Sequence, residues 1–401
     1  MQLFHEKFNL PAPKLVDPLE RQKLRLMFRN ERHLHKRKCS LTGRDIISMY
    51  PVDAPFPVYH RDAWWSDNWN PLIYGRDFDF TKTFTENFRE LQKYVPKMNL
   101  IIVNVVNSEY TNYVVDVKNC YLVNGTIFAE DCYYGSPYYC KDCVDSTLLR
   151  HSELCYECVD SEKLYNCDFC TDCQNSRDLS YCYDVKTSHD CVFCVGLRNA
   201  EYHIFNKKYS KEEYEKKLIE LNLKNPSQKL FEQWEDIKCK VPRQFMVGTH
   251  NENATGNYLF HCKNTVESFN CEECEDCAYA AQVMHAKDCQ DLNYMEFAEL
   301  CYNSIGYWRN YQVWFSNTCG DCKFVQYSEF CANSKYLFGC ISLKNQEYCI
   351  FNKKYSKEEY EKLEAKIINH MKETGEYGNF FDKSLSPFTY EESCANDYFP
   401  R

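Results

Sequence analysis

Small or apolar residues recur at every third position through two long stretches of the chain, and charged residues fall between them. The cysteines mark this pattern most clearly. Ten of them lie between Cys140 and Cys194 and eleven lie between Cys262 and Cys349, and every separation within each set is a multiple of three. An α-helix has 3.6 residues per turn, so a strict period of three would leave its buried face within a few turns. The pattern therefore predicts short strands joined by tight corners.

A second period, of twelve residues, is superimposed on the first. The frames that open at Cys155 and Cys167 read CYECVDSEKLYN and CDFCTDCQNSRD, and Cys120 and Cys132 extend the series upstream if one residue is deleted. Self-similarity at a short fixed period is typical of a solenoid, in which each repeat forms one coil. Twelve residues at ~3.3 Å each give a perimeter of about 40 Å, which leaves room inside for small side chains. A wider coil, built from two such frames per turn, remains open from the sequence.

We therefore predict a mainly β protein with two tandem narrow β-solenoids, over residues 96–205 and 251–350. Frame positions 1, 4, 7 and 10 should point inward and the other positions outward. The cysteines at position 1 should then form a structural ladder inside the coils. The members of this ladder are Cys143, Cys155, Cys167, Cys191, Cys277, Cys289 and Cys301.

The two arrays look like duplicates, and each is followed by the same helical signal. FNKKYSKEEYEKKL at Phe205–Leu218 recurs as FNKKYSKEEYEKL at Phe351–Leu363. Each copy holds an S-x-x-E capping box before a helical charge pattern. We predict a capping α-helix at the end of each solenoid, where it would cover an exposed strand edge. The segment 206–250 is then a helix and linker, and 351–401 is a helix with an irregular tail.

The N-terminal region, residues 1–95, differs from both arrays. Asp17 and Pro18 predict the start of a basic helix that runs to Cys39, and Phe84, Phe88 and Leu91 predict a short helix before Pro96. The first helix and the aromatic block after it are candidates for nucleic-acid binding, since Arg contacts phosphate and Trp stacks on bases. The alternative is that the helix packs on an acidic flank of its own solenoid above a small tryptophan core. The candidate residues are Arg21, Arg25, Arg29, Arg32, Lys36, Arg37, Lys38, Trp64 and Trp65.

Charge and composition narrow the class of protein. The 401 residues carry a formal net charge of −10, and residues 108–204 alone hold 16 acidic and 7 basic side chains. This excludes a globally basic nucleic-acid binder but not a locally basic element. The chain has no apolar run of membrane-spanning length and no signal-like N-terminus, so we expect a cytoplasmic protein that makes no membrane contact. The 26 cysteines are then expected to be reduced thiols or metal ligands.

Two clusters have metal-ligand spacing, but the repeat also accounts for them. C-x-x-C-x-x-C occurs at Cys167, Cys170 and Cys173 and again at Cys271, Cys274 and Cys277, and either cluster alone suits zinc or an iron–sulfur cluster. Because each of these cysteines also falls on the period of three, we favour a structural ladder and no cofactor, with zinc as the alternative. No histidine lies in a catalytic motif and no glycine-rich phosphate loop occurs, so we do not expect an enzyme.

Several strings in the chain resemble an uncharacterised cysteine-rich family associated with candidate-phyla-radiation bacteria. They include FRNERHLHKRKC, DAWWSDNWNPLIYG, SELCYECVDS and SLSPFTY, and the resemblance covers nearly the whole chain. It implies no known activity. It also implies a zinc ribbon built from C-x-x-C pairs around the basic helix. This chain keeps Cys39 and has His60 at two of those positions, whereas Val16, Leu19, Thr42 and Ala63 occupy others. Since a structural zinc site needs four ligands, the ribbon here is degenerate.

Three functions stay open at this point. We favour a non-catalytic binding or scaffold protein that contacts RNA through the basic N-terminal helix, or contacts another protein. One alternative is a metal-binding or thiol-redox protein that uses the cysteines. Another is an acidic solenoid that mimics nucleic acid and binds a basic protein.

Overall fold

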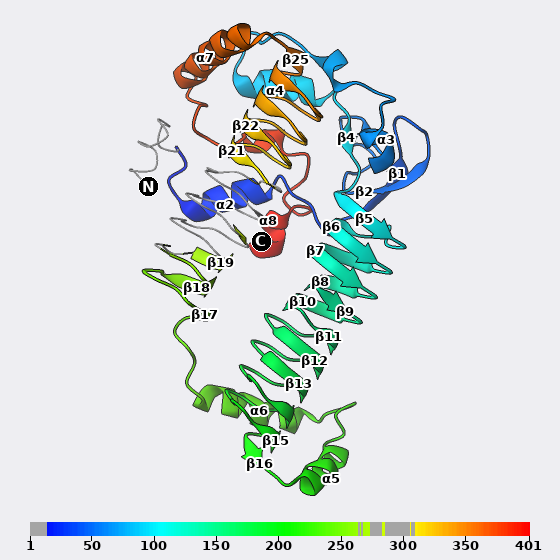
Figure 1. Ribbon diagram of the computed structural model, residues 1–401, viewed down its shortest axis with the longest axis vertical. Coiled ribbons are helices and arrows are strands. Elements are labelled where there is room, and N and C mark those ends of the chain that lie inside the picture. Colours follow the sequence, from blue (N-terminus) through cyan, green and yellow to red (C-terminus); the bar gives the residue numbers. More distant parts are fainter. Residues whose placement is uncertain (1–13, 264, 266–267, 273–282, 285–304, 306–308) are drawn as a thin grey trace. The chain divides into compact units, whose positions relative to one another are not determined.

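The structure is a computed structural model that describes the chain except for residues 1–13, 264, 266–267, 273–282, 285–304 and 306–308 (Figure 1). The chain forms two compact units. We call Leu100–Phe245 the central unit, and Met1–Asn99 with Met246–Arg401 the terminal unit. Among the described residues, no helix combines the length and apolar composition that crossing a bilayer requires.

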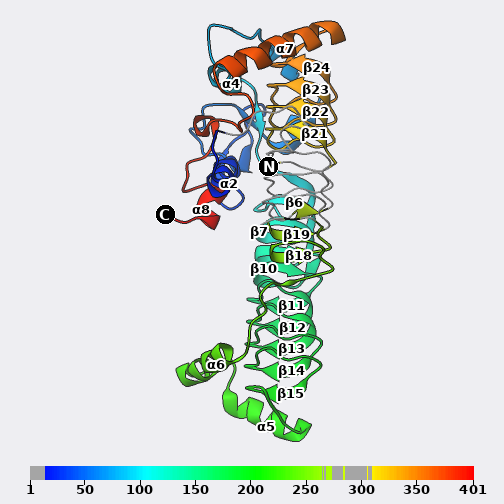
Figure 2. The same cartoon turned by 90° about the vertical axis from the view of Figure 1, so that its left-hand side faces the viewer.

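The central unit is a β-solenoid whose coils stack along one axis (Figure 2). Its strands pair in parallel at an offset of one frame, as in Cys167 with Leu179 and Leu179 with Cys191, so each coil takes one frame and not two. One coil is shorter, because Tyr133 pairs with Val144, and this confirms the single deletion expected near Cys132. The strands are β5 Ile102–Val106, β6 Asn112–Lys118, β7 Tyr121–Glu130, β8 Tyr133–Tyr138, β9 Cys140–Lys141, β10 Val144–Arg150, β11 Glu153–Tyr156, β12 Glu162–Asp168, β13 Gln174–Ser180, β14 His189–Val192 and β15 Glu201–Ile204.

The period of three comes from four corners in each coil. Every third residue adopts a positive φ, as in Glu157 (47°), Asp160 (48°), Lys163 (54°) and Asn166 (53°). The left-handed conformation turns the chain, and the residue after each corner points inward. Asn and Asp tolerate this conformation better than other non-glycine residues, which explains why they are frequent at the corners.

The inward phase predicted from the cysteine spacing is confirmed for the described ladder residues. Cys143, Cys155, Cys167 and Cys191 are each at most 2 % exposed. Their side chains satisfy backbone carbonyls: the Cys143 thiol lies 3.2 Å from the carbonyl of Lys141 and 3.7 Å from that of Ser152. Inward serines do the same, since Ser146 Oγ donates to the carbonyl of Val144 at 3.1 Å. Cys277, Cys289 and Cys301 lie outside the described residues.

The last coil of the central unit meets an antiparallel strand and two helices. β16 (Lys207–Lys208) pairs with β15, and α5 (Lys211–Leu221) and α6 (Gln228–Lys240) follow. The capping box predicted at the start of α5 is confirmed, because Ser210 and Glu213 each accept from the other's backbone N–H. Tyr214 of α5 is 3 % exposed, in a cluster with Ile204 of the last coil.

The terminal unit combines the N-terminal region with the second array. Its N-terminal elements are α2 Pro18–Leu26, β1 His35–Lys38, β2 Asp45–Ser48, β3 Val58–Tyr59, α3 Arg61–Trp65, the 3₁₀ helix η1 Pro71–Tyr74, α4 Phe84–Gln92 and β4 Lys97–Met98. The short helix predicted before Pro96 is therefore confirmed as α4. The prediction of one basic helix to Cys39 is wrong, because α2 ends at Leu26 and His35–Lys38 pairs antiparallel with Asp45–Ser48. The Asn30 side chain fixes the intervening turn through hydrogen bonds to His33 and Met49.

The described coils of the second array repeat the geometry of the central unit. Val325 pairs with Leu337 and Leu337 with Cys349, again at an offset of one frame. The capping box at Ser356 and Glu359 starts α7, as predicted. The elements of this part are β17 Gly248–Thr249, β18 Gly256–Phe260, β19 Ser268–Glu272, β20 Val283–Met284, β21 Tyr311–Trp314, β22 Lys323–Gln326, β23 Lys335–Phe338, β24 Glu347–Ile350, β25 Lys353–Lys354, α7 Lys357–Glu373, the 3₁₀ helix η2 Lys383–Leu385 and α8 Cys394–Tyr398.

Candidate binding surfaces

The basic residues predicted to form one stripe are divided between the interior and the surface. Arg21, Arg25 and Arg29 are 2 %, 0 % and 4 % exposed, and Arg29 pairs with the buried Glu31. The expectation of a continuous phosphate-binding stripe on a helix is therefore wrong, because the helix is short and its arginines pack inside the terminal unit. Arg37 is half-buried and donates to the carbonyl of Pro51. Exposed positions are left to Arg32, Lys36 and Lys38.

The predicted base-stacking tryptophans surround a lysine of the second array. Lys344 Nζ lies 5.1 Å from the ring centroid of Trp64, 5.9 Å from that of Trp65 and 5.2 Å from that of Trp69. It also donates to the carbonyl of Trp64 at 2.6 Å. Trp64 is 2 % exposed and Trp65 46 % exposed, so Trp64 offers no free face for a base. The sequence pointed to the tryptophans but gave no sign of Lys344, which lies far from them along the chain.

The cysteine clusters proposed as metal ligands lie in the ladder. Cys167, Cys170 and Cys173 are each at most 1 % exposed, and each thiol donates to a backbone carbonyl two residues before it. Burial raises the pKa of the Cys170 thiol well above its ordinary value, which disfavours its thiolate, whereas hydrogen bonds with the Cys155 and Cys170 thiols lower the pKa of Cys167. In the described part of the chain, no group of three or more His, Cys, Asp and Glu side chains is arranged to hold a metal ion. Cys271 is buried, whereas Cys274 and Cys277 lie outside the described residues.

Cys39 and His60 occupy two of the positions that the resemblance gives to a zinc ribbon. The backbone N–H of His60 donates to Cys39 Sγ at 3.2 Å. Burial opposes ionisation of Cys39, but hydrogen bonds from Thr42 and from backbone N–H groups lower its pKa overall. Burial lowers the pKa of His60. One thiol and one imidazole supply two of the four ligands that a structural zinc site needs, so this pair does not make one.

One corner of the coils in the central unit carries stacked aromatic rings, and we call it the aromatic corner. It lies at frame position 3, which is the first position of each frame with a positive φ. Phe169, Tyr181, Phe193 and Phe205 stack with centroid distances of 4.5, 4.7 and 5.0 Å and interplanar angles of 4°, 11° and 6°. These distances match the spacing of neighbouring strands, so each coil adds one ring to the column. Aromatic residues at intervals of twelve are the sequence signal of this corner, and the predictions from the cysteine spacing did not include it.

Helix α6 covers the last part of this corner. Phe231 lies 5.4 Å from Tyr181 and 5.9 Å from Phe193, and Trp234 packs on the same two rings. Lys238 Nζ lies 3.5 Å above the Trp234 ring. Under this cover Tyr181 is 7 % exposed and Phe193 is fully buried. An amphipathic helix with an aromatic face thus fits the corner.

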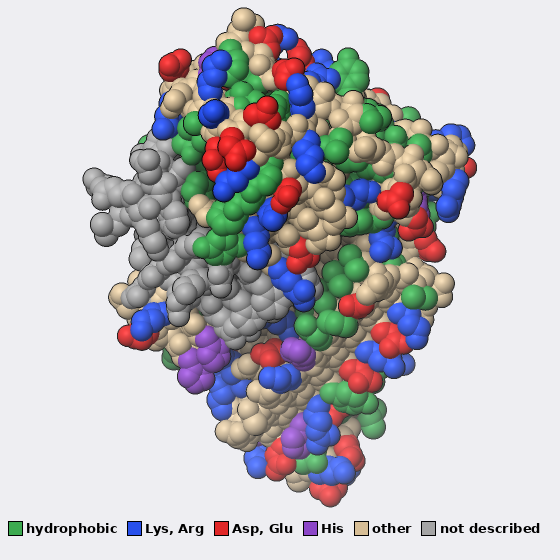
Figure 3. Space-filling model, turned by 45° about the horizontal axis from the view of Figure 1, so that its top comes forward, with side chains coloured by type: hydrophobic (Ala, Val, Ile, Leu, Met, Phe, Trp, Pro, Cys, Tyr) green, Lys and Arg blue, Asp and Glu red, His purple; other side chains and the backbone are tan. Residues whose placement is uncertain are grey.

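The earlier part of the same corner is uncovered. Tyr121, Tyr133, Tyr134 and Tyr156, at frame positions 2 and 3, are 38–44 % exposed. Tyr121 contacts Tyr134 at 5.9 Å, and Tyr156 contacts Phe169 of the covered part at 5.2 Å. The space-filling view shows how hydrophobic side chains reach the molecular surface between acidic and basic ones (Figure 3).

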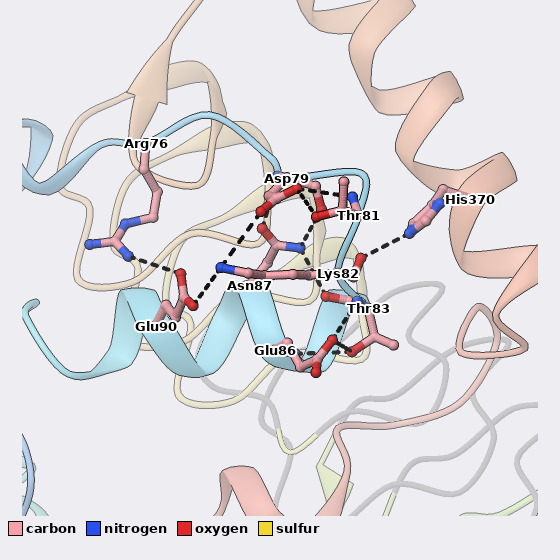
Figure 4. Close-up of polar contacts among 9 residues, drawn as sticks. All are labelled: Arg76, Asp79, Thr81, Lys82, Thr83, Glu86, Asn87, Glu90 and His370. Atoms are coloured by element: carbon pink, nitrogen blue, oxygen red, sulfur yellow. Dashed lines mark hydrogen bonds and ion pairs between the residues drawn. The ribbon is translucent and has the colours of Figure 1, made fainter.

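The start of α4 carries a polar network that joins it to α7 within the terminal unit (Figure 4). Lys82 Nζ lies 2.8 Å from Glu90 and 3.6 Å from Asp79, and the Lys82 carbonyl is 2.9 Å from Nε2 of His370 on α7. A Thr83–Glu86 capping box closes the first turn of α4. The network holds the loop before α4 in place and has the character of a helix start.

A cavity of about 1170 Å³ lies beside this helix start in the terminal unit. The Glu376 carboxylate, at its wall, accepts from the backbone N–H groups of Phe84 and Thr85 at 2.8 and 2.9 Å. The protein's own carboxylate thus occupies the anion-binding N-terminus of α4. The walls of the cavity also include apolar residues such as Met27, Phe380 and Phe381.

No protein-family model matches this chain, and the search among curated proteins likewise finds no match.

Proposed function

We propose that the protein is a non-catalytic binding scaffold made of two tandem β-solenoids, each ended by a capping helix, and that its partner is a protein. The caps are supported by Tyr214 of α5 and Tyr360 of α7, which are 3 % and 2 % exposed where they pack on the last coils. The observation that carries the binding function is the aromatic corner of the central unit, which is covered by α6 in one part and open in the other.

The covered part indicates what the open part would bind. α6 places Phe231 and Trp234, one helical turn apart, on the rings of the corner. The open part offers tyrosines at frame positions 2 and 3, and it places acidic residues, Asp145 and Glu157, at position 3. We therefore infer a partner helix that carries aromatic residues three or four apart and basic residues beside them. The 13 residues of α6 would extend about 20 Å, or roughly four coils at strand spacing.

The electrostatics favour a protein partner over RNA. Residues 108–204 hold 16 acidic and 7 basic side chains, which repel phosphate. The arginines expected to contact RNA are mostly inside the terminal unit. An acidic solenoid that binds a basic protein agrees with this surface, and we include it in the same proposal because the inferred helix is basic at its flank. The thiol-redox and metal alternatives gain no support from a ladder of buried thiols that donate to carbonyls.

The test uses the α6 sequence as a model of the partner. The probe is a fluorescent peptide of residues 228–240 with Cys239→Ser, titrated into the full chain and followed by fluorescence anisotropy. We expect saturable binding that is weakened at least tenfold by Tyr134→Ala combined with Tyr156→Ala. Tyr139→Ala is the matched control, because Tyr139 is as exposed as Tyr134, at 44 %, but lies at another corner of the coil.

Three results would overturn the proposal. The peptide could fail to bind, or Tyr139→Ala could weaken binding as strongly as the double variant. The loss could instead follow Phe193→Ala, which would mean that the peptide replaces α6 on its own site. Tight binding of single-stranded RNA that is lost when Arg32, Lys36 and Lys38 become Ala would support the nucleic-acid hypothesis instead.

A further inference from the structure

The three tryptophans around Lys344 form a cage from one short segment. Trp64 and Trp65 end α3 with their rings 4.9 Å apart and nearly perpendicular, at 82°. The Trp69 ring lies 6.1 Å from that of Trp64 and is tilted by 53°. Indole faces attract cations through their quadrupole, and aromatic cages of this kind recognise quaternary ammonium groups and methylated lysine in other proteins.

The segment also supplies hydrogen-bond acceptors beneath the rings. Lys344 Nζ donates to the carbonyl of Trp64 at 2.6 Å and lies 3.4 Å from the carbonyl of Ser66. The Asp67 carboxylate adds a favourable charge. A cation that fits all of these groups needs N–H donors, so the cage suits a primary ammonium better than a quaternary one.

The shape of the cage does not depend on Lys344. Trp69 Nε1 donates to the carbonyl of Trp64 at 2.8 Å, and Ser66 Oγ donates to that of Ala63 at 2.8 Å. The Trp69 ring packs edge-on against Tyr59 at 5.3 Å. These contacts are all made within Tyr59–Trp69, so the cage can persist when the lysine leaves. Trp65 is 46 % exposed, which gives a ligand access from solvent.

We propose that the Trp64–Trp69 segment is a binding site for primary alkylammonium groups, with Lys344 as its resident ligand. The ligand class is an unbranched amine such as the side chain of a lysine on another protein or a polyamine. Burial lowers the pKa of Lys344, because the cage removes water from the ammonium, and an amine that replaces Lys344 is desolvated in the same way. This site is separate from the aromatic corner and does not depend on the proposed function.

The test is chemical rescue of the full chain with Lys344→Ala. n-Butylammonium replaces the deleted side chain, and binding is read from tryptophan fluorescence and from the melting temperature. We expect saturable binding to the variant and binding at least about tenfold weaker to the unchanged chain, because an amine must first displace Lys344 from the cage. Tetramethylammonium should bind at least about tenfold more weakly, because it cannot donate to the two carbonyls. Sodium chloride at equal ionic strength is the salt control.

A second variant shows whether the cage is responsible. Lys344→Ala combined with Trp65→Ala should lose the rescue. The proposal is overturned if n-butylammonium acts no differently from sodium chloride, if tetramethylammonium binds equally well, or if the rescue survives loss of Trp65. Should Lys344→Ala not fold, Lys344→Gln takes its place. Refolding either variant with and without n-butylammonium then decides, because an ammonium site predicts recovery with the amine alone.

Discussion

The ion pair between Lys97 and Glu329 allows a quantitative test of how the N-terminal region is held on the second array. Lys97 Nζ lies 2.9 Å from Glu329 Oε2, and both side chains are 0 % exposed. Glu329 points outward from its coil and is buried because β4 packs over it. The ammonium also lies 4.7 Å from the ring centroid of Phe56, and Gln92 Nε2 donates to the same carboxylate oxygen at 3.2 Å.

Removing one of the two charges should destabilise the fold much more than removing both. Lys97→Met leaves the Glu329 carboxylate buried without its counterion, and such a change destabilises by about 3–5 kcal/mol. Glu329→Leu should act in the same direction because it strands the ammonium. The double variant Lys97→Met with Glu329→Leu removes both charges and fills the space with apolar atoms. Its free energy of unfolding should therefore lie within about 1 kcal/mol of that of the unchanged chain.

The assay is urea unfolding followed by tryptophan fluorescence in a Trp234→Phe background. Five of the six tryptophans belong to the terminal unit, so this background makes the signal report on that unit. The reasoning is refuted if each single variant changes the free energy of unfolding by less than about 1 kcal/mol, because the charges would then not be desolvated. It is also refuted if the cost of the double variant equals the sum of the singles.

Three further predictions concern the coils and their helices. Cys170→Ser should lower the free energy of unfolding by on the order of 1 kcal/mol, because inward serines make the same contact with a backbone carbonyl. Cys170→Arg would bury a charge and should prevent the central unit from folding. Circular dichroism measures both effects. Brief alkylation of the native chain should modify Cys239, the exposed cysteine among those described, before any ladder cysteine, as peptide mapping would show. Hydrogen bonds from backbone N–H groups lower the pKa of Glu213 and Glu359. The stability that these carboxylates add is therefore present above the carboxyl pKa of the unfolded chain and is lost as pH falls through the lower pKa of the folded chain. The melting temperature of the helices, followed by circular dichroism, should be lower at pH 3 than at pH 5.

The solenoid could be predicted in detail because a strict period leaves a direct trace in the sequence. An inward residue every third position is buried in every coil, so Cys155, Cys167 and Cys191 report the phase without knowledge of their neighbours. The capping boxes at Ser210 and Ser356 were equally local, since each joins residues three apart. Features with these short ranges need no tertiary information.

The predictions that were wrong and the features that were missed depend on contacts between residues far apart in the sequence. Arg29 looks like a surface residue in the sequence, but its backbone carbonyl accepts from Cys394 and its side chain pairs with a buried glutamate. Lys344 reaches the tryptophans from the second array, far along the chain. The charge pattern between Pro18 and Cys39 is compatible with a helix and with a strand. The end of this segment is a strand because His35–Lys38 pairs with Asp45–Ser48, a contact that the pattern itself does not reveal.

The corners of the coil connect its stability to its binding surface. A non-glycine residue with positive φ is strained by about 1 kcal/mol or more, and side-chain columns help to offset this strain in each coil. Asn166 donates to Asp178 at 2.7 Å one coil above, and the rings at other corners stack in the same way. Exposed tyrosines at the corners therefore stabilise the coil whether or not a partner binds. Tyr134 and Tyr139 have φ values of 59° and 53°. The Tyr134 ring contacts Tyr121 at 5.9 Å, whereas Tyr139 stacks on Phe128 and His151 at 5.0 and 4.8 Å, so replacing Tyr139 by Ala should disturb folding at least as much as replacing Tyr134. A loss of peptide binding that already appears with Tyr134→Ala alone, but not with Tyr139→Ala, then measures recognition at the aromatic corner and not damage to the solenoid.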